Sequence, residues 1–321
     1  MNKLTISGLK VLKKIYCTCL RSQNLPKPKC GQDSDEAAQI IYNGLMSDKP
    51  YMIARFGSTE MACLGNYIGI TTQKNRVFDY IKGLTKPWWW EPKIINQMQQ
   101  WSGFFPARAD KIEQFCKLMI QDIPQVDILG SWLPDEQLFN QELKNCQKIN
   151  FELLNPYFSK TPWTKALAGK KVLVIHPFAR TIAKQYKKRE LLFKDDLLPE
   201  FQLMTIQAVQ SIAGTPTSFD DWFAALDFMK AEIDKQDYDI CLIGCGAYGF
   251  PLAAHVKRKG KKSFQLGGSL QLLFGISGKR WENANYNSQY NYAQLINEHW
   301  VKPGDEEKPE GAVNVEGACY W

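Results

Sequence analysis

Several signatures of known functional classes are absent from this chain of 321 residues. It has no RNP motif, no zinc-finger spacing and no heptad-linked basic region, so a nucleic-acid partner is not expected. No apolar run approaches the ~20 residues of a membrane-spanning helix. The nine cysteines are irregularly spaced, and the single close pair, Cys17 and Cys19, lacks the second pair that a zinc site requires.

A secretory signal is also missing, which together with the unpaired cysteine pattern predicts a reduced, cytoplasmic protein. Lysine and arginine outnumber aspartate and glutamate by 40 to 33, a net charge of +7. This balance suits an anionic ligand or an acidic membrane surface.

The chain divides into three parts. Residues 1–35 comprise a basic amphipathic segment and a linker with two prolines, residues 36–300 form the main domain, and residues 301–321 form a tail rich in glycine, proline and glutamate that is predicted to be loosely ordered. Within residues 1–20, apolar residues alternate with lysines. This pattern fits a helix at the inner face of the cell membrane, resting on anionic lipid, but it also fits a packing helix or a loosely attached tail.

The main domain alternates strands and helices. Short apolar strand patterns are found at 51–55, 171–176, 201–206, 238–243 and 263–266, with helical patterns between them. This alternation predicts an α/β, Rossmann-like, doubly wound and mainly parallel sheet with helices on both faces. Residues 75–165 are predicted to form a helical, aromatic-rich insertion. Ser218 is predicted to cap a helix that has Asp221 at its third position and ends near residue 235.

A glycine loop lies between the strand at 238–243 and the next helix. Gly244, Gly246 and Gly249 fit the G-x-G-x-x-G pattern, which lets backbone N–H groups approach a phosphate. Two features argue against a dinucleotide site. The loop comes about three-quarters along the chain, and no carboxylate follows the next strand to hold a ribose. NAD is therefore not expected, and an NAD(P)-dependent oxidoreductase stays an alternative.

Two further segments are chemically suggestive. A second glycine-rich turn, at 267–275, follows the adjacent predicted strand and precedes Lys279 and Arg280, which can reach a diphosphate. Near the start of the domain, Arg55-Phe-Gly-Ser-Thr-Glu60 leads from a strand into a helix. A carboxylate in that first helical turn is favoured by the helix dipole, and it can also bind a divalent metal or sugar hydroxyls.

The ordered set of Arg-Phe-Gly-x-x-Glu, the central strand 172–178 and the late Ile-Gly-Cys-Gly-Ala-Tyr-Gly loop resembles the GT-D class of bacterial glycosyltransferases. The resemblance covers most of residues 36–282. It implies a GT-D-like enzyme of the hexosyltransferase type that moves a sugar from a nucleotide-diphosphate sugar, above all a UDP-sugar, to a saccharide or lipid-linked acceptor. The pathways implied are those of bacterial surface glycans and glycoprotein glycans.

The resemblance also implies a donor site. Its residues are Arg55, Phe56, Gly57, Ser58, Gly244, Gly246, Ala247, Tyr248, Gly249, Gly268, Gln271, Lys279 and Arg280. The family has an Asp-x-Glu pair after its Arg-Phe-Gly, associated with a divalent metal. Here Ser58 replaces the aspartate and Glu60 matches the glutamate. One carboxylate is a poor Mg²⁺ or Mn²⁺ site. Glu60 is the candidate metal ligand, and loss of the first acid leaves open a non-catalytic protein that binds nucleotide or glycan as an assembly partner.

The remaining catalytic candidates are His176, which ends a strand on the ligand edge, and Asp135, together with Glu60. His176 can equally be satisfied by backbone, and Asp135 can be an exposed acid in a turn. Trp88, Trp89 and Trp90 lie between two prolines, and three adjacent indoles cannot all enter one core. At least one of them is expected to face a cleft, where it would bind the acceptor.

Overall fold

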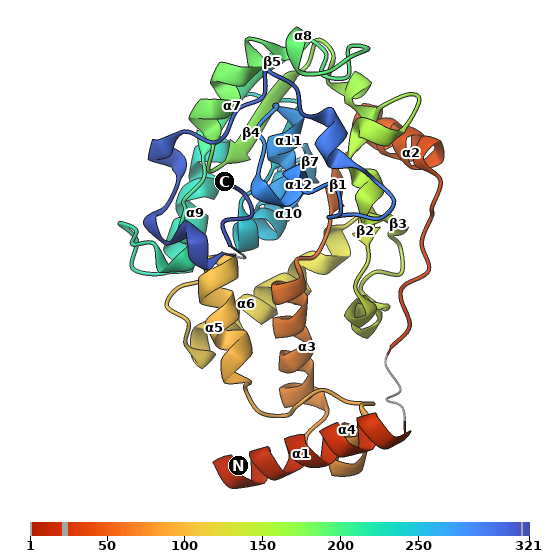
Figure 1. Ribbon diagram of the computed structural model, residues 1–321, viewed down its shortest axis with the longest axis vertical. Coiled ribbons are helices and arrows are strands. Elements are labelled where there is room, and N and C mark those ends of the chain that lie inside the picture. The colour runs from red at the N-terminus through yellow and green to blue at the C-terminus, as the bar shows by residue number, and fades with distance from the viewer. Residues whose placement is uncertain (1, 21–24, 316) are drawn as a thin grey trace.

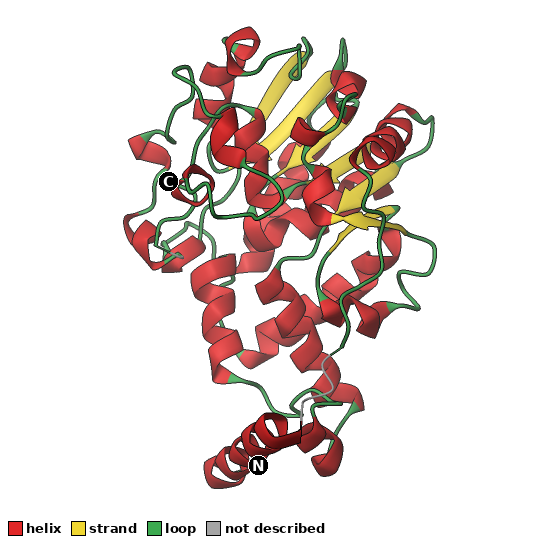
Figure 2. Cartoon of the chain, turned by 45° about the vertical axis from the view of Figure 1, so that its right-hand side comes forward, coloured by secondary structure: helices red, strands yellow, loops and turns green. Residues whose placement is uncertain are grey.

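The computed structural model describes residues 2–20, 25–315 and 317–321, and its centre is a seven-stranded parallel sheet with helices on both faces (Figures 1 and 2). The strand order is β3-β2-β1-β7-β6-β4-β5. The strands are β1 (Tyr51–Ala54), β2 (Ile128–Ser131), β3 (Gln147–Asn150), β4 (Lys171–His176), β5 (Gln202–Gln207), β6 (Ile240–Ile243) and β7 (Lys262–Gln265). The predicted doubly wound α/β fold is confirmed.

The described residues also form twelve α-helices. They are α1 (Lys3–Leu20), α2 (Ser34–Met46), α3 (Ser58–Thr72), α4 (Val77–Lys82), α5 (Pro92–Ser102), α6 (Ala109–Asp122), α7 (Ala179–Tyr186), α8 (Arg189–Leu192), α9 (Trp222–Asp234), α10 (Gly249–Arg258), α11 (Leu270–Leu273) and α12 (Lys279–Glu282). No helix of the described residues is both long and apolar enough to cross a bilayer.

Two hydrophobic cores lie on the two faces of the sheet because successive strand residues point to opposite faces. In β4, Leu173 and Ile175 join one core, with residues of α3, α6, α9 and α10. Val172 and Val174 join the other core, with residues of α2, α7 and α11. Burial on both faces explains why the strands read as nearly continuous apolar runs.

The prediction for residues 75–165 was incomplete. Helices α4, α5 and α6 are present, but β2 and β3 also fall in this range and extend the sheet beyond β1. β3 (Gln147–Asn150) is largely polar, and β2 (Ile128–Ser131) has two apolar residues followed by glycine and serine, so neither produces an apolar pattern that the sequence can reveal. The predicted cap of α9 was also wrong. Asp221, not Ser218, is the N-cap, and it accepts a 2.9 Å hydrogen bond from the Ala224 N–H.

A helical lobe extends from the carboxyl ends of the strands. In Figure 1, α3, α5 and α6 lie beyond that edge, and α1 crosses the far end of the lobe beside α4. Within the segment 1–20 that was predicted to be amphipathic, Lys3–Leu20 form the helix α1, which packs on the lobe through Leu9.

The C-terminal segment is well packed, whereas its composition predicts loose order. Val315, Cys319 and Trp321 are buried in the same core as α7 and α11. Glu307 is buried and accepts a 2.8 Å hydrogen bond from the Arg180 N–H, together with bonds from the Thr181 N–H and hydroxyl, at the start of α7. The carboxylate thus satisfies N–H groups that the helix itself cannot.

Replacing this carboxylate tests how the C-terminal segment is held. Glu307→Ala leaves three donors without their acceptor and should lower the free energy of unfolding by about 2–3 kcal/mol in denaturant titrations. Glu306→Ala is the matched control, because its exposed side chain makes no hydrogen bond to a described residue, and it should change stability by less than about 0.5 kcal/mol. Equal effects of the two substitutions would contradict the capping role.

Candidate functional site

A cavity of about 340 Å³ lies at the carboxyl edge of the sheet. Its walls come from the segments that follow β1, β2, β4, β5, β6 and β7, from the end of α5, and from the C-terminal segment. Ligands of open α/β sheets bind at this edge. Of the predicted site residues, the lining contains Arg55, Phe56, Gly57, Ser58, Glu60, His176, Gly244, Gly246, Ala247, Tyr248, Gly268, Gln271 and Arg280.

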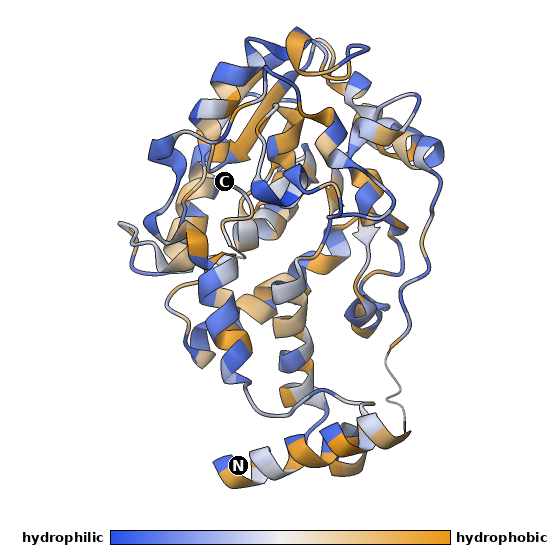
Figure 3. Cartoon of the chain, viewed as in Figure 1, coloured by the Kyte–Doolittle hydropathy of each residue, from blue (hydrophilic) through white to orange (hydrophobic). Residues whose placement is uncertain are grey.

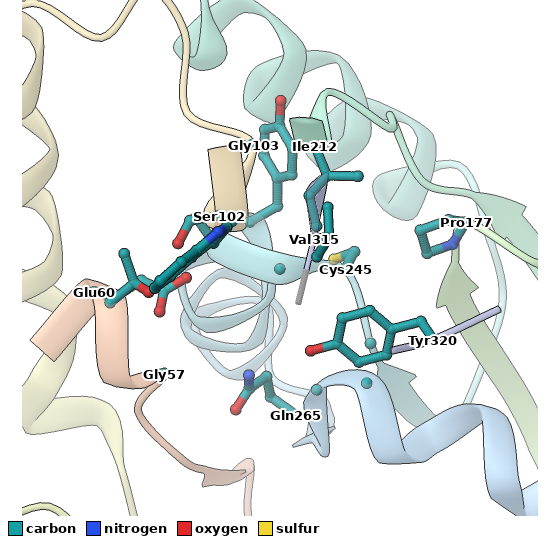
Figure 4. A pocket seen from close by; sticks show the side chains of 18 of the residues that line it. Gly57, Glu60, Ser102, Gly103, Pro177, Ile212, Cys245, Gln265, Val315 and Tyr320 are labelled. Carbon is teal, nitrogen blue, oxygen red and sulfur yellow. The ribbon is translucent and has the colours of Figure 1, made fainter. Parts of the chain in front are cut away.

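Glu60 lies in the first turn of α3, directly after β1. Its carboxylate folds back over Gly57, where a β-carbon would lie 1.9 Å from Oε2, so a larger residue at 57 would displace the carboxylate. The side chain is 9% exposed and lines the cavity, yet it accepts no hydrogen bond from any residue that the structure describes. Figure 4 shows Glu60 and Tyr320 on opposite sides of the cavity. A carboxylate held this way is available to a ligand.

Arg55, at the end of β1, lies against the turn after β7. A β-carbon at position 267 would be 2.0 Å from an Arg55 guanidinium nitrogen, and Gly267 has φ +68°. The backbone conformation favours glycine, and a β-carbon here would displace the Arg55 guanidinium. The side-chain oxygen of Gln265 accepts a 2.9 Å hydrogen bond from the Arg55 N–H, which fixes the start of this loop.

Arg280 supplies a second guanidinium to the lining. It lies over the ring of Tyr320, 4.9 Å from the centroid, and also faces Tyr286 at 5.7 Å. Its Nη2 contacts Cys319 Sγ at 3.2 Å. The aromatic rings orient this cation through their negative faces. The C-terminal segment, which carries Tyr320 and Cys319, therefore forms part of the site.

The glycines of the two loops serve mainly internal packing. A β-carbon on Gly244 would lie 2.6 Å from the Gly267 carbonyl oxygen, and one on Gly249 would lie 3.0 Å from Gln265. A β-carbon on Gly268 would lie 2.2 Å from the Tyr320 ring. Gly246 differs, because its φ of +57° shapes the loop backbone. The G-x-G-x-x-G pattern thus reflects close contact between neighbouring loops as much as access to a phosphate.

Tyr248, predicted to bind the donor, is held by the protein. Its hydroxyl lies 3.0 Å from Ser211 Oγ, which in turn donates to the Gly103 carbonyl. Its ring stacks on Trp222 with centroids 5.0 Å apart. Burial raises the pKa of the Tyr248 hydroxyl, so the group stays neutral. It forms a rigid wall that ties the glycine loop to the end of α5.

His176, at the end of β4, is a hydrogen-bond donor rather than a base. Its Nδ1 accepts a 3.0 Å bond from the Phe178 N–H, which assigns the proton to Nε2. Burial lowers the pKa of His176 to about 3. A neutral imidazole of such low basicity does not take a proton near neutral pH, whereas its Nε2–H can donate to a ligand.

Gln271 presents an unsatisfied acceptor at the same cavity. The side chain is completely buried, and Nε2 donates to the carbonyl oxygens of Ile276, Ser277 and Tyr320. Oε1 has no hydrogen-bond partner among the described residues. Gln271 thus binds the C-terminal segment to α11 and leaves its Oε1 without a hydrogen-bond donor among the described residues.

The side chains of the cavity do not fit a metal ion that is held by protein ligands alone. Glu60 is the one carboxylate among the lining residues that the structure describes, and no group of three His, Cys, Asp or Glu side chains within residues 2–20, 25–315 and 317–321 is arranged to hold a metal. Ser58, where the resembling family has its first acid, supplies no charge. Mg²⁺ and Mn²⁺ require several oxygen ligands.

Several predicted residues lie outside the cavity lining. Lys279 is exposed and donates to the Gly317 carbonyl at 3.4 Å, and Gly249 is covered by Gln265. Asp135 pairs with Lys86 at 2.6 Å in a second cavity.

The three tryptophans face different neighbours and also lie outside the lining. Trp88 and Trp89 pack on Tyr80 beneath α1, and Trp90 stacks on Tyr67. Their indoles therefore hold the lobe together around α1.

Other aromatic residues form the cavity wall instead. Trp101, at the end of α5, is 39% exposed and lines the cavity. Trp132, after β2, donates from its indole nitrogen to the Phe56 carbonyl at 3.1 Å and stacks on Phe151. Sequence reasoning missed both because β2 was not recognised as a strand, and because Trp101 ends a helix that has no motif of its own.

The buried His176 makes stability depend on pH. Its folded-state pKa, about 3, lies below the ordinary value of 6.5. Its contribution is therefore complete above pH 6.5 and is lost progressively as pH falls toward 3. Acidification from about pH 7 to about pH 5 should lower the free energy of unfolding by roughly 2 kcal/mol through this residue. His176→Asn keeps an acceptor for the Phe178 N–H. In urea titrations of this variant, the loss of unfolding free energy between these two pH values should be smaller than in the wild type by the same amount. An unchanged dependence would contradict the assignment.

Comparison with known proteins adds little to this description. No family model matches the chain, and no curated protein matches it. Two solved structures overlap it at low similarity. One is described as "The highly conserved domain of unknown function 1792 has a distinct glycosyltransferase fold", with 11% identity, a TM-score of 0.38, and coverage of 94% of this chain and 96% of that chain. The other is a selenomethionine-substituted structure of the same domain, with 12% identity, a TM-score of 0.34, and coverage of 92% and 95%. These values are too low to decide the function of this chain.

Proposed function

We propose that the protein is a glycosyltransferase that moves a sugar from a nucleotide-diphosphate sugar, a UDP-sugar by preference, to a saccharide or lipid-linked acceptor. The observation that carries this proposal is the composition of the cavity at the carboxyl edge of the sheet. Two guanidinium groups, Arg55 and Arg280, line it together with the carboxylate of Glu60. Arginine suits a diphosphate, and a lone carboxylate suits sugar hydroxyls.

Each group has a role in such a transfer. Arg55 and Arg280 would stabilise the negative charge that develops on the leaving nucleotide diphosphate as the bond from the anomeric carbon to its oxygen breaks. The Nε2–H of His176 would donate to the same anion. Glu60 would accept the proton that the acceptor hydroxyl loses as its oxygen bonds to the anomeric carbon. Trp101 offers an indole face for a sugar ring.

The oxidoreductase alternative is less well supported by the same cavity. The segment after β7 carries glycines at 267 and 268 and no acid that could bind a ribose. Two glycines of the fingerprint loop, Gly244 and Gly249, are accounted for by contacts with Gly267 and Gln265.

Ligand binding separates these two enzyme classes directly. In thermal-shift titrations of the full chain against UDP-sugars, other nucleotide sugars and NADH, a nucleotide sugar should stabilise the protein by about 2.7 kcal/mol at a hundredfold excess over its dissociation constant. The series is run with and without Mn²⁺, since diphosphate oxygens can complete a metal site that the protein leaves incomplete. Stabilisation by NADH with none by any nucleotide sugar would overturn the proposal.

Glu60→Gln tests the chemistry at constant shape. We expect sugar transfer to fall about 10²–10⁴-fold, the usual worth of a general base, with donor binding retained in the thermal-shift assay. Glu36→Gln is the matched control, because Glu36 also lies in the first helical turn, of α2, and is exposed. Transfer that is unaltered in Glu60→Gln would show that Glu60 is not the base.

A further inference from the structure

Helix α1 has two apolar sides, and the rest of the protein covers one of them. Leu9 is buried and Ile6 is partly buried against Tyr80, Trp88 and Trp89. Lys13 lies over the Tyr80 ring, 4.5 Å from its centroid, and Lys10 pairs with Glu91 at 2.6 Å. These contacts fix the rotation of the helix, and therefore which of its residues face outward.

The outward side is strongly apolar. Leu4 is 84% exposed, and Val11, Leu12 and Ile15 are 57%, 51% and 55% exposed. At 3.6 residues per turn these four side chains fall within an arc of about 100°, on the side of the helix away from Ile6 and Leu9. A contiguous apolar stripe of this kind marks a surface that binds something.

Lysines flank the stripe on one side. Lys3, Lys10 and Lys14 fall between the packed side and the exposed apolar side of α1 by the same geometry. Lys3 and Lys14 are exposed, and neither forms an ion pair with a described residue. No acidic residue occurs within α1. The outward surface thus combines an apolar stripe with positive charge that no acidic residue of α1 offsets.

The position of α1 leaves this surface accessible. Figure 1 shows the helix at the end of the molecule opposite the sheet, with its axis across the long axis of the protein. In Figure 3 its ribbon carries apolar segments along its length. Phe78 on the neighbouring α4 is 78% exposed and adds a further apolar side chain at this end.

We propose that the outward face of α1 binds the surface of an anionic lipid bilayer, with the helix lying in the interfacial plane. The apolar stripe would enter the boundary between headgroups and acyl chains, while the lysines meet anionic headgroups. Charge complementarity selects this occupant. A second copy of the chain would present the same lysines and no acidic residue of α1, so it offers this face no complementary charge.

A second cavity lies between the inward side of α1 and the start of α3. Its volume is about 620 Å³, and its lining includes Lys13 and Cys17 of α1, Gln73 beyond the end of α3, and Ser58 at the start of α3. Ser58 also lines the first cavity. Helix α1 therefore lies about one length of α3, roughly 22 Å, from Glu60. The use of this proximity for a lipid-linked acceptor rests on the proposed function, whereas lipid binding by α1 does not.

Vesicle flotation of the full chain tests the proposal without any nucleotide sugar. The probes are vesicles of equal parts phosphatidylglycerol and phosphatidylcholine, and vesicles of phosphatidylcholine alone. The protein should float with the anionic vesicles and bind the neutral ones at least about tenfold more weakly, with binding reduced by salt. Equal binding to both, or no binding to either, would overturn the proposal.

Variants assign the binding to α1. The double variant Leu12→Glu with Ile15→Glu should bind anionic vesicles at least about tenfold more weakly, and Lys3→Gln with Lys14→Gln should do likewise. The charge-matched control is Leu191→Glu with Phe228→Glu, which changes exposed apolar residues of α8 and α9 and should bind like the wild type. Vesicle binding that is unaltered by both α1 variants would overturn the proposal. The same holds if the variants abolish a dimer of the chain and leave vesicle binding intact. Thermal shifts with nucleotide sugars, measured separately on each variant, report on the proposed function alone.

Discussion

The Arg55 guanidinium lies against the bare α-carbon of Gly267, where β1 and β7 run side by side although they are about two hundred residues apart in the chain. Gly267 combines positive φ with a space that any β-carbon would fill, and Arg55 is placed by the backbone bond to Gln265. The contact brings the first and the last strand loops together, and the cavity forms between them.

The C-terminal segment depends on the same arrangement. Tyr320 packs on Gly268, one residue after Gly267, and Gln271 binds the Tyr320 carbonyl. At its other end the segment is anchored by Glu307 at the start of α7. Arg280 is then oriented by the Tyr320 ring. Composition alone marked these residues as loosely ordered, because single apolar residues among glycine and glutamate give no periodic pattern, yet each finds a buried partner elsewhere in the chain.

Local buried environments explain why some predicted residues have other roles than expected. His176 ends a strand, as predicted, but full burial and the Phe178 N–H make it a neutral donor. Asp135 is balanced by Lys86, and the tryptophans at 88–90 pack beneath α1. In each case the sequence identified a residue capable of chemistry, and the neighbours that surround it in the folded chain decided what that residue does.

The sequence by itself determined the alternation of strands and helices, the parallel sheet, the placing of Arg55, His176 and Gly244 at strand ends, and the placing of Glu60 in the helical turn that follows. These features follow from local periodicity and from βα connectivity. Tertiary structure alone decided that β7 lies next to β1, that β2 and β3 extend the sheet, and that the C-terminal segment closes the cavity. These features depend on side chains far apart in sequence fitting against one another, and no local pattern encodes such contacts.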